Sequence, residues 1–272
     1  MRVFFCGVRG STPAPGPDFV RYGGHTSCVA VAHDGQPPTL VLDAGTGLRN
    51  LDRLLDGQPF RGSLLLGHLH WDHTHGLPFW RGGSRPDTRA DLYLPEQGGA
   101  DVERVLARAI SPPHFPVEPH VLGPGLSFSP LKEGWHELEG FSVLARDIPH
   151  KGGHTMGLRV SDGRSTLAYL SDHSQAAYAD ERAYPDSLLE LVGGVDLLLH
   201  DAQHVAAEWP AAGYLGHATV DYAVALARSA GVRRLGLFHH SPDRTDDEID
   251  VILAPLDPSR VFAAAEGMVV DL

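Results

Sequence analysis

The chain carries the stretch HLHWDH at residues 68–73, directly after the apolar run LLL at residues 64–66. Three imidazoles and one carboxylate, which are side chains that bind Zn²⁺, Mn²⁺ or Fe, therefore stand almost side by side. If a β-strand ends here, His68 and His70 point the same way, because side chains alternate between the two faces of a strand. These imidazoles can hold one ion, while Asp72 and His73 lie in the following turn and can begin a second site. The chain has 17 histidines in 272 residues, so a histidine-rich polar turn is the alternative, but this order of ligand types favours a metal site.

Four further motifs place a candidate ligand at or just past the end of a predicted strand. They are Asp43 in LDAGTG, His150 in IPHKGG, Asp172 in YLSDH and His239 in LFHHS. Together with HLHWDH they resemble the motifs of the metallo-β-lactamase-fold hydrolases, in the order of that family and across about residues 2–271. The resemblance implies a layered α/β fold, an αββα sandwich of two mixed sheets flanked by helices, with residues 1–272 as a single hydrolase domain.

The resemblance also implies two divalent metal ions, with Zn²⁺ as the first expectation and Mn²⁺ or Fe as alternatives. The implied ligands are His68, His70 and His150 for the first ion, Asp72, His73 and His239 for the second, and Asp172 as the bridge between them.

Residues beside the implied ligands have expected roles of their own. Asp43 is expected to accept a hydrogen bond from a ligand imidazole, since metal-bound histidines usually donate their second N–H group to a carboxylate. The alternative is a turn residue that supports its own backbone. His154 rivals His150, and His240 rivals its neighbour His239, but the family pattern favours the first of each pair. Two more histidines, expected to support the ligands or to face solvent, are His75 and His173.

Residues 216–219 read GHAT at a predicted helix start, about twenty residues before His239. This motif is similar to one in the phosphodiesterase branch of the fold, which includes RNase Z and related cyclic-nucleotide phosphodiesterases. In that branch a histidine of the motif touches the phosphate and an upstream glutamate orients it, which implies these roles for His217 and Glu208. A helix N-terminus beside metal ions suits an anion, and the alternative is that His217 only caps its helix. Asp72 completes the expected catalytic residues.

Two Gly-rich segments, residues 9–12 and 22–27, resemble loops that line the cleft in bacterial hydrolases of this branch. Arg9 is expected either to meet a phosphate oxygen or, equally, to form a surface salt bridge, and Thr26 belongs to the same expected substrate loops. RNase Z enzymes also carry an extended arm that holds tRNA. No basic segment of this sequence would serve as such an arm.

The motifs predict a dinuclear metal-dependent hydrolase. The first expectation is a phosphodiesterase for a small or cyclic phosphodiester, in which a metal-bound hydroxide attacks phosphorus. One alternative is a lactone, thioester or carboxylic-ester hydrolase on the same metals, which would not need a phosphate-directed His217. An alternative of another class is a metal-binding sensor or scaffold without turnover, against which the full set of ligands argues.

Composition narrows the expected partners. The chain has 34 acidic and 22 basic residues, a net charge of −12, whereas proteins that bind duplexes or tRNA need basic stripes. No apolar run reaches the roughly 18 residues of a membrane span, no signal peptide is recognisable, and two cysteines, Cys6 and Cys28, do not suggest a disulfide framework. We therefore expect a cytoplasmic protein with a small phosphodiester as its partner, no extended nucleic-acid surface and no membrane contact. The sequence leaves open whether the chain forms a homodimer.

Patterns of apolar residues also predict the elements. Strands are expected near residues 2–6, 28–33, 39–43, 63–67, 90–94, 141–147, 155–161, 166–171, 195–200, 234–239, 260–265 and 268–271. Helices are expected at residues 101–110, 186–192, 218–230 and 245–254. Asp101 is the expected cap of the first helix, and Thr245 with Glu248 forms a capping box for the last. This alternation favours a layered α/β fold.

Overall fold

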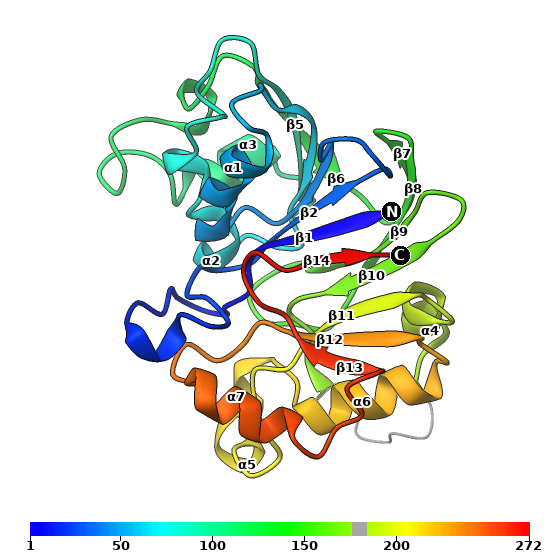
Figure 1. Ribbon diagram of the computed structural model, residues 1–272. Helices are drawn as coiled ribbons and strands as arrows, with labels where there is room; N and C mark the ends of the chain where they lie inside the picture. The colour runs from blue at the N-terminus through cyan, green and yellow to red at the C-terminus, as the bar shows by residue number, and fades with distance from the viewer. Residues whose placement is uncertain (176–183) are drawn as a thin grey trace.

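The computed structural model describes residues 1–175 and 184–272 (Figure 1). The strands are β1 (Arg2–Gly7), β2 (Cys28–Ala32), β3 (Leu40–Leu42), β4 (Arg61–Leu65), β5 (Arg89–Pro95), β6 (Leu126–Leu131), β7 (Gly134–Leu138), β8 (Phe141–Asp147), β9 (Met156–Ser161), β10 (Thr166–Leu170), β11 (Leu197–Asp201), β12 (Arg234–Phe238), β13 (Val261–Ala263) and β14 (Val269–Asp271). The α-helices are α1 (Leu51–Leu54), α2 (Trp71–Thr74), α3 (Val102–Ala107), α4 (Asp186–Val192), α5 (Trp209–Ala212), α6 (Val220–Ser229) and α7 (Asp246–Leu253), and the 3-10 helix η2 (Thr46–Asn50) runs directly into α1.

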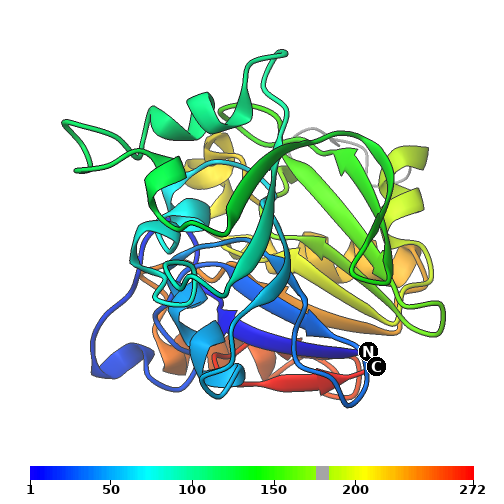
Figure 2. The same ribbon diagram turned by 90° about the horizontal axis from the view of Figure 1, so that it is seen from above.

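The strands form two seven-stranded sheets that share one pattern of pairing. The first sheet has the order β14-β1-β2-β3-β4-β5-β6, and the second has the order β13-β12-β11-β10-β9-β8-β7. Pairing is parallel from β3 to β6 in the first sheet and from β10 to β13 in the second, and antiparallel elsewhere. Both sheets are therefore mixed. Because β1 pairs with β14, the two termini lie side by side (Figure 2).

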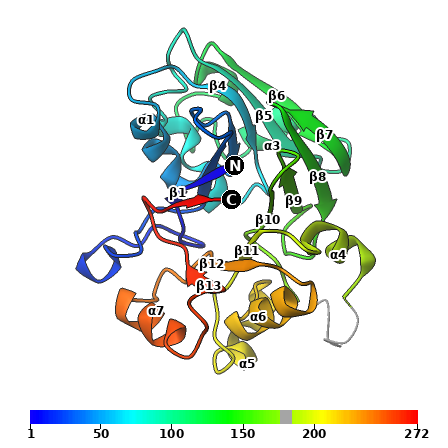
Figure 3. The same cartoon turned by 45° about the vertical axis from the view of Figure 1, so that its right-hand side comes forward.

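Three apolar clusters explain the layers. One lies between the sheets and joins side chains such as Val29 and Leu42 of the first sheet to Leu158 and Leu199 of the second. Another packs α1 and α3 against the outer face of the first sheet. The third packs α4 and α6 against the outer face of the second sheet, which is visible in Figure 3. Removing this apolar surface from water drives the layers together, and the predicted αββα sandwich is confirmed.

Two predicted helix caps are confirmed, and a third helix has a cap other than the one considered from the sequence. Asp101 caps α3 by accepting a hydrogen bond from the Arg104 N–H group. Thr245 and Glu248 form both hydrogen bonds of the predicted capping box at the start of α7. The cap of α6 is Thr219, whose side chain accepts from the Tyr222 N–H group. His217 is therefore not the cap of this helix, and the GHAT motif leaves its ring free for another role.

The sequence patterns miss β6 and β7, the strands at one edge of each sheet. Both are largely half-buried or exposed, so they lack the apolar alternation that marks the inner strands.

Cys6 and Cys28 are buried free thiols. No helix within residues 1–175 and 184–272 combines the length and apolar character needed to cross a bilayer.

Candidate metal centre

The predicted ligands and Asp43 meet at one edge of the two sheets, past the ends of the parallel-paired strands β3, β4, β10 and β12 and of the antiparallel-paired strand β8. In the first sheet Asp43 follows β3, and the segment 68–73 follows β4. In the second sheet His150 follows β8, Asp172 follows β10 and His239 follows β12. The carboxyl ends of parallel strands are a common place for a site in α/β folds, because the loops beyond them converge. Here the loops of two facing sheets converge.

The segment 68–73 does not continue its strand, contrary to the sequence expectation. β4 ends at Leu65, and residues 71–74 form the short helix α2, with His70 in an extended conformation at its N-cap. The N–H group of Gly67 donates to Asp43 Oδ1 at 2.6 Å, which takes the chain out of the strand ladder. Strand alternation is therefore the wrong reason for the shared direction of His68 and His70, and a loop achieves the same result.

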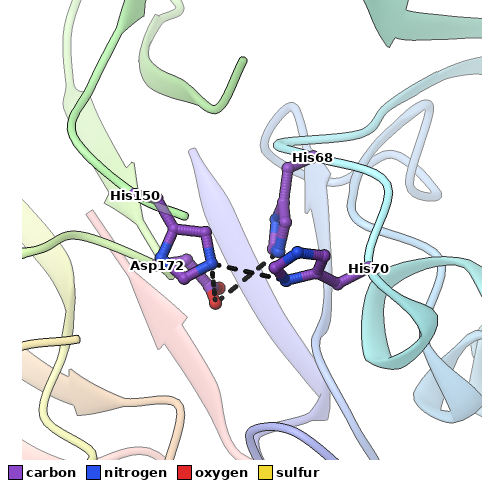
Figure 4. A group of neighbouring side chains, drawn as sticks. All are labelled: His68, His70, His150 and Asp172. Carbon is purple, nitrogen blue, oxygen red and sulfur yellow. Dashed lines mark hydrogen bonds and ion pairs between the residues drawn. The ribbon is translucent and has the colours of Figure 1, made fainter. Parts of the chain in front are cut away.

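The first group of potential ligands comprises His68, His70, His150 and Asp172, shown in Figure 4. One ligand atom from each lies within 4.8 Å of the others. Asp172 Oδ1 lies 3.7 Å from His68 Nε2 and 3.5 Å from His150 Nε2. His150 Nδ1 donates to the Gly216 carbonyl at 2.7 Å, which leaves Nε2 facing the group.

The second group comprises Asp72, His73, Asp172 and His239. Asp172 Oδ2 lies 3.0 Å from His73 Nε2 and 3.3 Å from His239 Nε2. Asp72 Oδ2 approaches the same two nitrogens at 3.2 and 3.1 Å. Asp172 thus turns one oxygen to each group, as a bridging carboxylate would. Each group also combines side chains from the loops of both sheets.

The donor atoms fit divalent cations. Within the described parts of the chain, His68 Nε2, His73 Nε2 and Asp172 Oδ2 are buried without a hydrogen-bond partner, although an unsatisfied buried polar group costs about 1–3 kcal/mol. Burial holds the pKa of His68 well below its usual range, which favours the neutral form that binds metals. Burial opposes ionisation of Asp172, but His239 and His73 hold its pKa well below the ordinary range. Burial also lowers the pKa of His70 and His150. His73 differs: burial opposes its charged form, but the Asp72, Asp43 and Asp172 carboxylates hold its pKa well above the usual range. The first group therefore has the neutral imidazoles that bind metals, whereas His73 would have to give up a proton to a metal ion.

Asp43 supports the second group by binding the ring nitrogen of His73 that faces away from the other ligands. Its Oδ2 accepts hydrogen bonds from His73 Nδ1 and from the Tyr169 hydroxyl, both at 2.7 Å. The same carboxylate also holds the Gly67 N–H group, so it both orients an imidazole and supports a neighbouring backbone turn. Asp43 has φ 62°, a conformation that is uncommon for residues other than glycine, although aspartate adopts it more readily than most. Its partners from both sheets hold it in place.

His217 lies beside both groups and is held by Asp201, the last residue of β11. His217 Nδ1 donates to Asp201 Oδ2 at 2.8 Å, and the ring stacks on His239 with centroids 5.1 Å apart. Burial favours the neutral ring, but the Asp201 carboxylate raises the pKa of His217 to about 9. Sequence reasoning gave Asp201 no role, although its place at a strand end was the available signal. These two residues also form a third potential ligand group with Asp172 and His239.

Glu208 does not orient His217, and this prediction is wrong. Both Glu208 carboxylate oxygens accept from Arg244 Nη2, at 2.7 and 2.8 Å, and one accepts from the Val205 N–H group. Burial opposes ionisation, but the Arg244 hydrogen bond lowers the pKa of Glu208. The histidine nearest to it is His204, whose Nδ1 lies 3.7 Å away. Glu208 is therefore an ionised partner of Arg244 in a neighbouring loop.

Arg9 does not line the metal cleft, which contradicts its expected contact with a phosphate oxygen. The expected salt bridge exists but is buried and not at the surface, since Arg9 Nη2 lies 3.5 Å from Asp246 Oδ1. Arg9 is fully buried, and its guanidinium donates to the carbonyls of Gly23, Ser241 and Arg244. Thr26 is also buried, and it exchanges hydrogen bonds with Thr46. Both side chains hold the N-terminal loop to its neighbours instead of meeting substrate.

The structure separates the competing histidines. His154 is about half exposed, with its side chain 54% accessible, and its Nδ1 lies 3.2 Å from Asp147. His240 is buried and its Nε2 bonds to the Ala264 carbonyl at 2.9 Å, away from both groups. Two further histidines lie beside the ligands in the sequence. His173 is buried, with its Nδ1 2.8 Å from His200 Nε2, whereas His75 is exposed.

The environments of His150 and His154 predict different effects of substitution. His150→Ala should weaken metal binding strongly because it removes a donor atom from the first group, whereas His154→Ala should change it little. Metal titration of both variants followed by calorimetry checks this, and His154→Ala serves as the matched control. Strong loss of affinity in His154→Ala with none in His150→Ala would contradict the placement of the site.

A cleft of about 340 Å³ opens over the two groups. Its size suits a small molecule or the end of a larger one. The residues that line it are Ser11, Leu69, His70, Trp71, Asp72, Asp172 and His217.

Comparison with known proteins agrees with this architecture. The family described as "Beta-lactamase superfamily domain" matches residues 39–240. The chain is 29% identical to the ribonuclease BN of Escherichia coli over 260 residues, which cover 79% of this chain and 82% of that protein.

Two solved structures share the fold. A diphosphatase of the PhnP family has a TM-score of 0.71 at 20% identity, over 100% of this chain and 97% of the other. The short form of human tRNase Z has a TM-score of 0.67 at 21% identity, over 100% of this chain and 99% of the other.

Proposed function

The chain belongs to the β-lactamase superfamily, and from this premise we propose that it is a dinuclear metal-dependent phosphodiesterase whose substrate is a small phosphodiester. The single observation that carries the proposal is Asp172, which turns one oxygen to each of two ligand groups. The relatives named for ribonuclease activity and the fold neighbour named as a diphosphatase support chemistry at phosphorus. We propose that residues 1–272 act as one hydrolase domain.

The proposed ligands are the members of the first two groups. His68, His70 and His150 would hold one ion, Asp72, His73 and His239 the other, and Asp172 both. When bound, two divalent cations supply Lewis acidity at phosphoryl oxygens and lower the pKa of a bound water. Zn²⁺ suits this mixture of imidazole and carboxylate, and so does Mn²⁺ or Fe.

His217 is the proposed proton donor. Asp201 holds its Nδ1–H group, so Nε2 is the nitrogen available to the cleft that His217 lines. The Asp201 carboxylate raises the pKa of His217 to about 9, which favours the charged form of the ring. The charged ring can stabilise negative charge that develops on phosphoryl oxygens and can give its Nε2 proton to the leaving oxygen. A lactone or thioester would not require this group.

The ribonuclease names of the relatives make RNA the second candidate substrate. The net charge of −12 favours a small molecule, because RNA binding depends heavily on basic side chains.

A turnover panel tests the proposal. The metal-stripped protein, reloaded in turn with Zn²⁺, Mn²⁺ or Fe²⁺, is offered bis(p-nitrophenyl) phosphate, cyclic nucleotides, a precursor tRNA, a lactone and a thioester. We expect about two ions per chain by elemental analysis and metal-dependent turnover of the small phosphodiesters. Turnover of the lactone or thioester well above any phosphodiester would reject the phosphate chemistry, and preference for the precursor tRNA would reject the small substrate.

A further inference from the structure

A second hollow, of about 610 Å³, lies on the outer side of the first sheet. It is formed by η2 and α1 together with the segment that follows α2. Arg49, Arg53 and Arg81 line it, as do His25 and His75. This is a concentration of cationic side chains on a chain whose net charge is −12.

The three arginines are free to bind a ligand. Arg49, Arg53 and Arg81 are exposed, and their guanidinium groups have no hydrogen bond or ion pair with any described residue. The carboxylate in the hollow, Asp52, is already engaged, because it accepts hydrogen bonds from Trp80 Nε1 at 2.8 Å and from the Gly82 N–H group at 3.2 Å. Three guanidinium charges therefore face one occupied carboxylate, which makes the hollow attractive to an anion.

The hollow lies next to the metal cleft, because two short segments of the chain contribute residues to the lining of both. Ser11 lines the cleft and Pro13, two residues further on, lines the hollow. Trp71 lines the cleft and His75 lines the hollow, and their rings stack with centroids 5.5 Å apart and an interplanar angle of 16°. The thickness of one stacked pair of rings thus separates the two spaces. The Trp71 side chain is 65% exposed, so it offers a face on which a base can rest.

We propose that the hollow binds a second phosphate group of the substrate, so that the preferred substrate is a nucleotide phosphodiester carrying an additional terminal phosphate. The inference rests on the proposed phosphodiesterase function. The scissile phosphodiester lies in the metal cleft, the base stacks on Trp71, and the terminal phosphate meets Arg49, Arg53 and Arg81. Guanidinium groups suit this role because they bind phosphate oxygens through two parallel hydrogen bonds.

A matched pair of substrates tests the inference. Thymidine 5′-(p-nitrophenyl phosphate) and its 3′-phosphorylated form share the scissile bond and the coloured product, and differ only in the second phosphate. For the metal-loaded protein, kcat/KM should be about ten- to a hundredfold higher for the 3′-phosphorylated form, the range expected for charge-assisted hydrogen bonds. The ratio should fall toward one when Arg49→Gln, Arg53→Gln and Arg81→Gln are combined, and partly in each single variant. Arg164→Gln, in the turn between β9 and β10, is the matched control and should keep the ratio.

The outcomes separate this inference from the proposed function. Turnover of both substrates with a ratio near one, or with a ratio that the three substitutions leave unchanged, would overturn the inference and leave the phosphodiesterase in place. If neither of these substrates is turned over, and bis(p-nitrophenyl) phosphate and the cyclic nucleotides are not turned over either, the proposed function fails. Calorimetry then decides the hollow alone: tighter binding of thymidine 3′,5′-bisphosphate than of thymidine 5′-monophosphate, lost in the triple variant, supports a phosphate site, and equal binding overturns it.

Discussion

Replacing Asp172 with alanine should remove both metal ions and lower kcat by roughly 10³-fold or more, the scale seen when a catalytic unit loses a member. The reason is its geometry, since Oδ1 faces His68 and His150 while Oδ2 faces His73 and His239. Loss of any other ligand would leave one group with its own donors intact. Elemental analysis and turnover of bis(p-nitrophenyl) phosphate measure the two effects.

Two further variants make the Asp172 result interpretable. Asp172→Asn keeps the shape of the side chain but removes its charge, so it should also lose metal while circular dichroism reports an intact fold. Asp147→Ala removes another carboxylate at a strand end, one that contacts His154 and the Thr155 backbone, and should retain both ions. If Asp172→Ala retains two ions and full activity, the bridge assignment is wrong.

His217→Ala should lower kcat by roughly 10² to 10³-fold, the loss expected for one preorganised donor or proton-transfer group. Metal content should hardly change, because His217 belongs to neither of the two proposed ligand groups. Elemental analysis measures the metal content and steady-state kinetics measures kcat, and His154→Ala is the matched control. A large loss of metal in His217→Ala would instead make His217 a ligand through the third group.

Asp201→Asn tests how His217 is positioned. The Asp201 carboxylate raises the pKa of His217, and the charged ring exists only below that pKa. Activity that needs the charged ring is lost as the pH rises through the pKa, so Asp201→Asn should move this alkaline loss to lower pH. The pH dependence of kcat measures the shift. Glu208→Gln should leave the profile in place, because Glu208 pairs with Arg244; the same shift in Glu208→Gln alone would restore Glu208 as the orienting group.

The sequence was sufficient for the fold and for the candidate ligands that the site brings together, but not for Asp201. HLHWDH and the later motifs occur in family order, and the apolar runs before them become the inner strands that deliver Asp43, Asp172 and His239 to one edge. Apolar runs of this kind are readable because burial between two sheets requires continuous hydrophobic side chains. The half-exposed edge strands β6 and β7 carry no such requirement, and their patterns were too weak to read.

The errors concern contacts between distant segments. Glu208 and Asp201 both precede His217 at short range, and only the packing of the loops decides that Asp201 reaches its ring. Arg9 binds carbonyls more than 200 positions away, at Ser241 and Arg244, which no local pattern predicts. The cationic hollow has the same origin, since it combines residues 13 to 81 that share no motif.

Because each ligand group takes donors from the loops of both sheets, the distance between the metals is set by how the two sheets sit against each other. A displacement of one sheet by an ångström would misplace half of each donor set without altering any ligand, and misplacements of that size can cost on the order of a hundredfold in rate. Leu42 and Leu199 lie in the interior between the sheets. Modest large-to-small changes at such positions would then lower the reaction rate, and larger changes would also lower the stability of the fold. In this architecture the packing of the hydrophobic interior therefore also sets the spacing of the metal ligands at its edge.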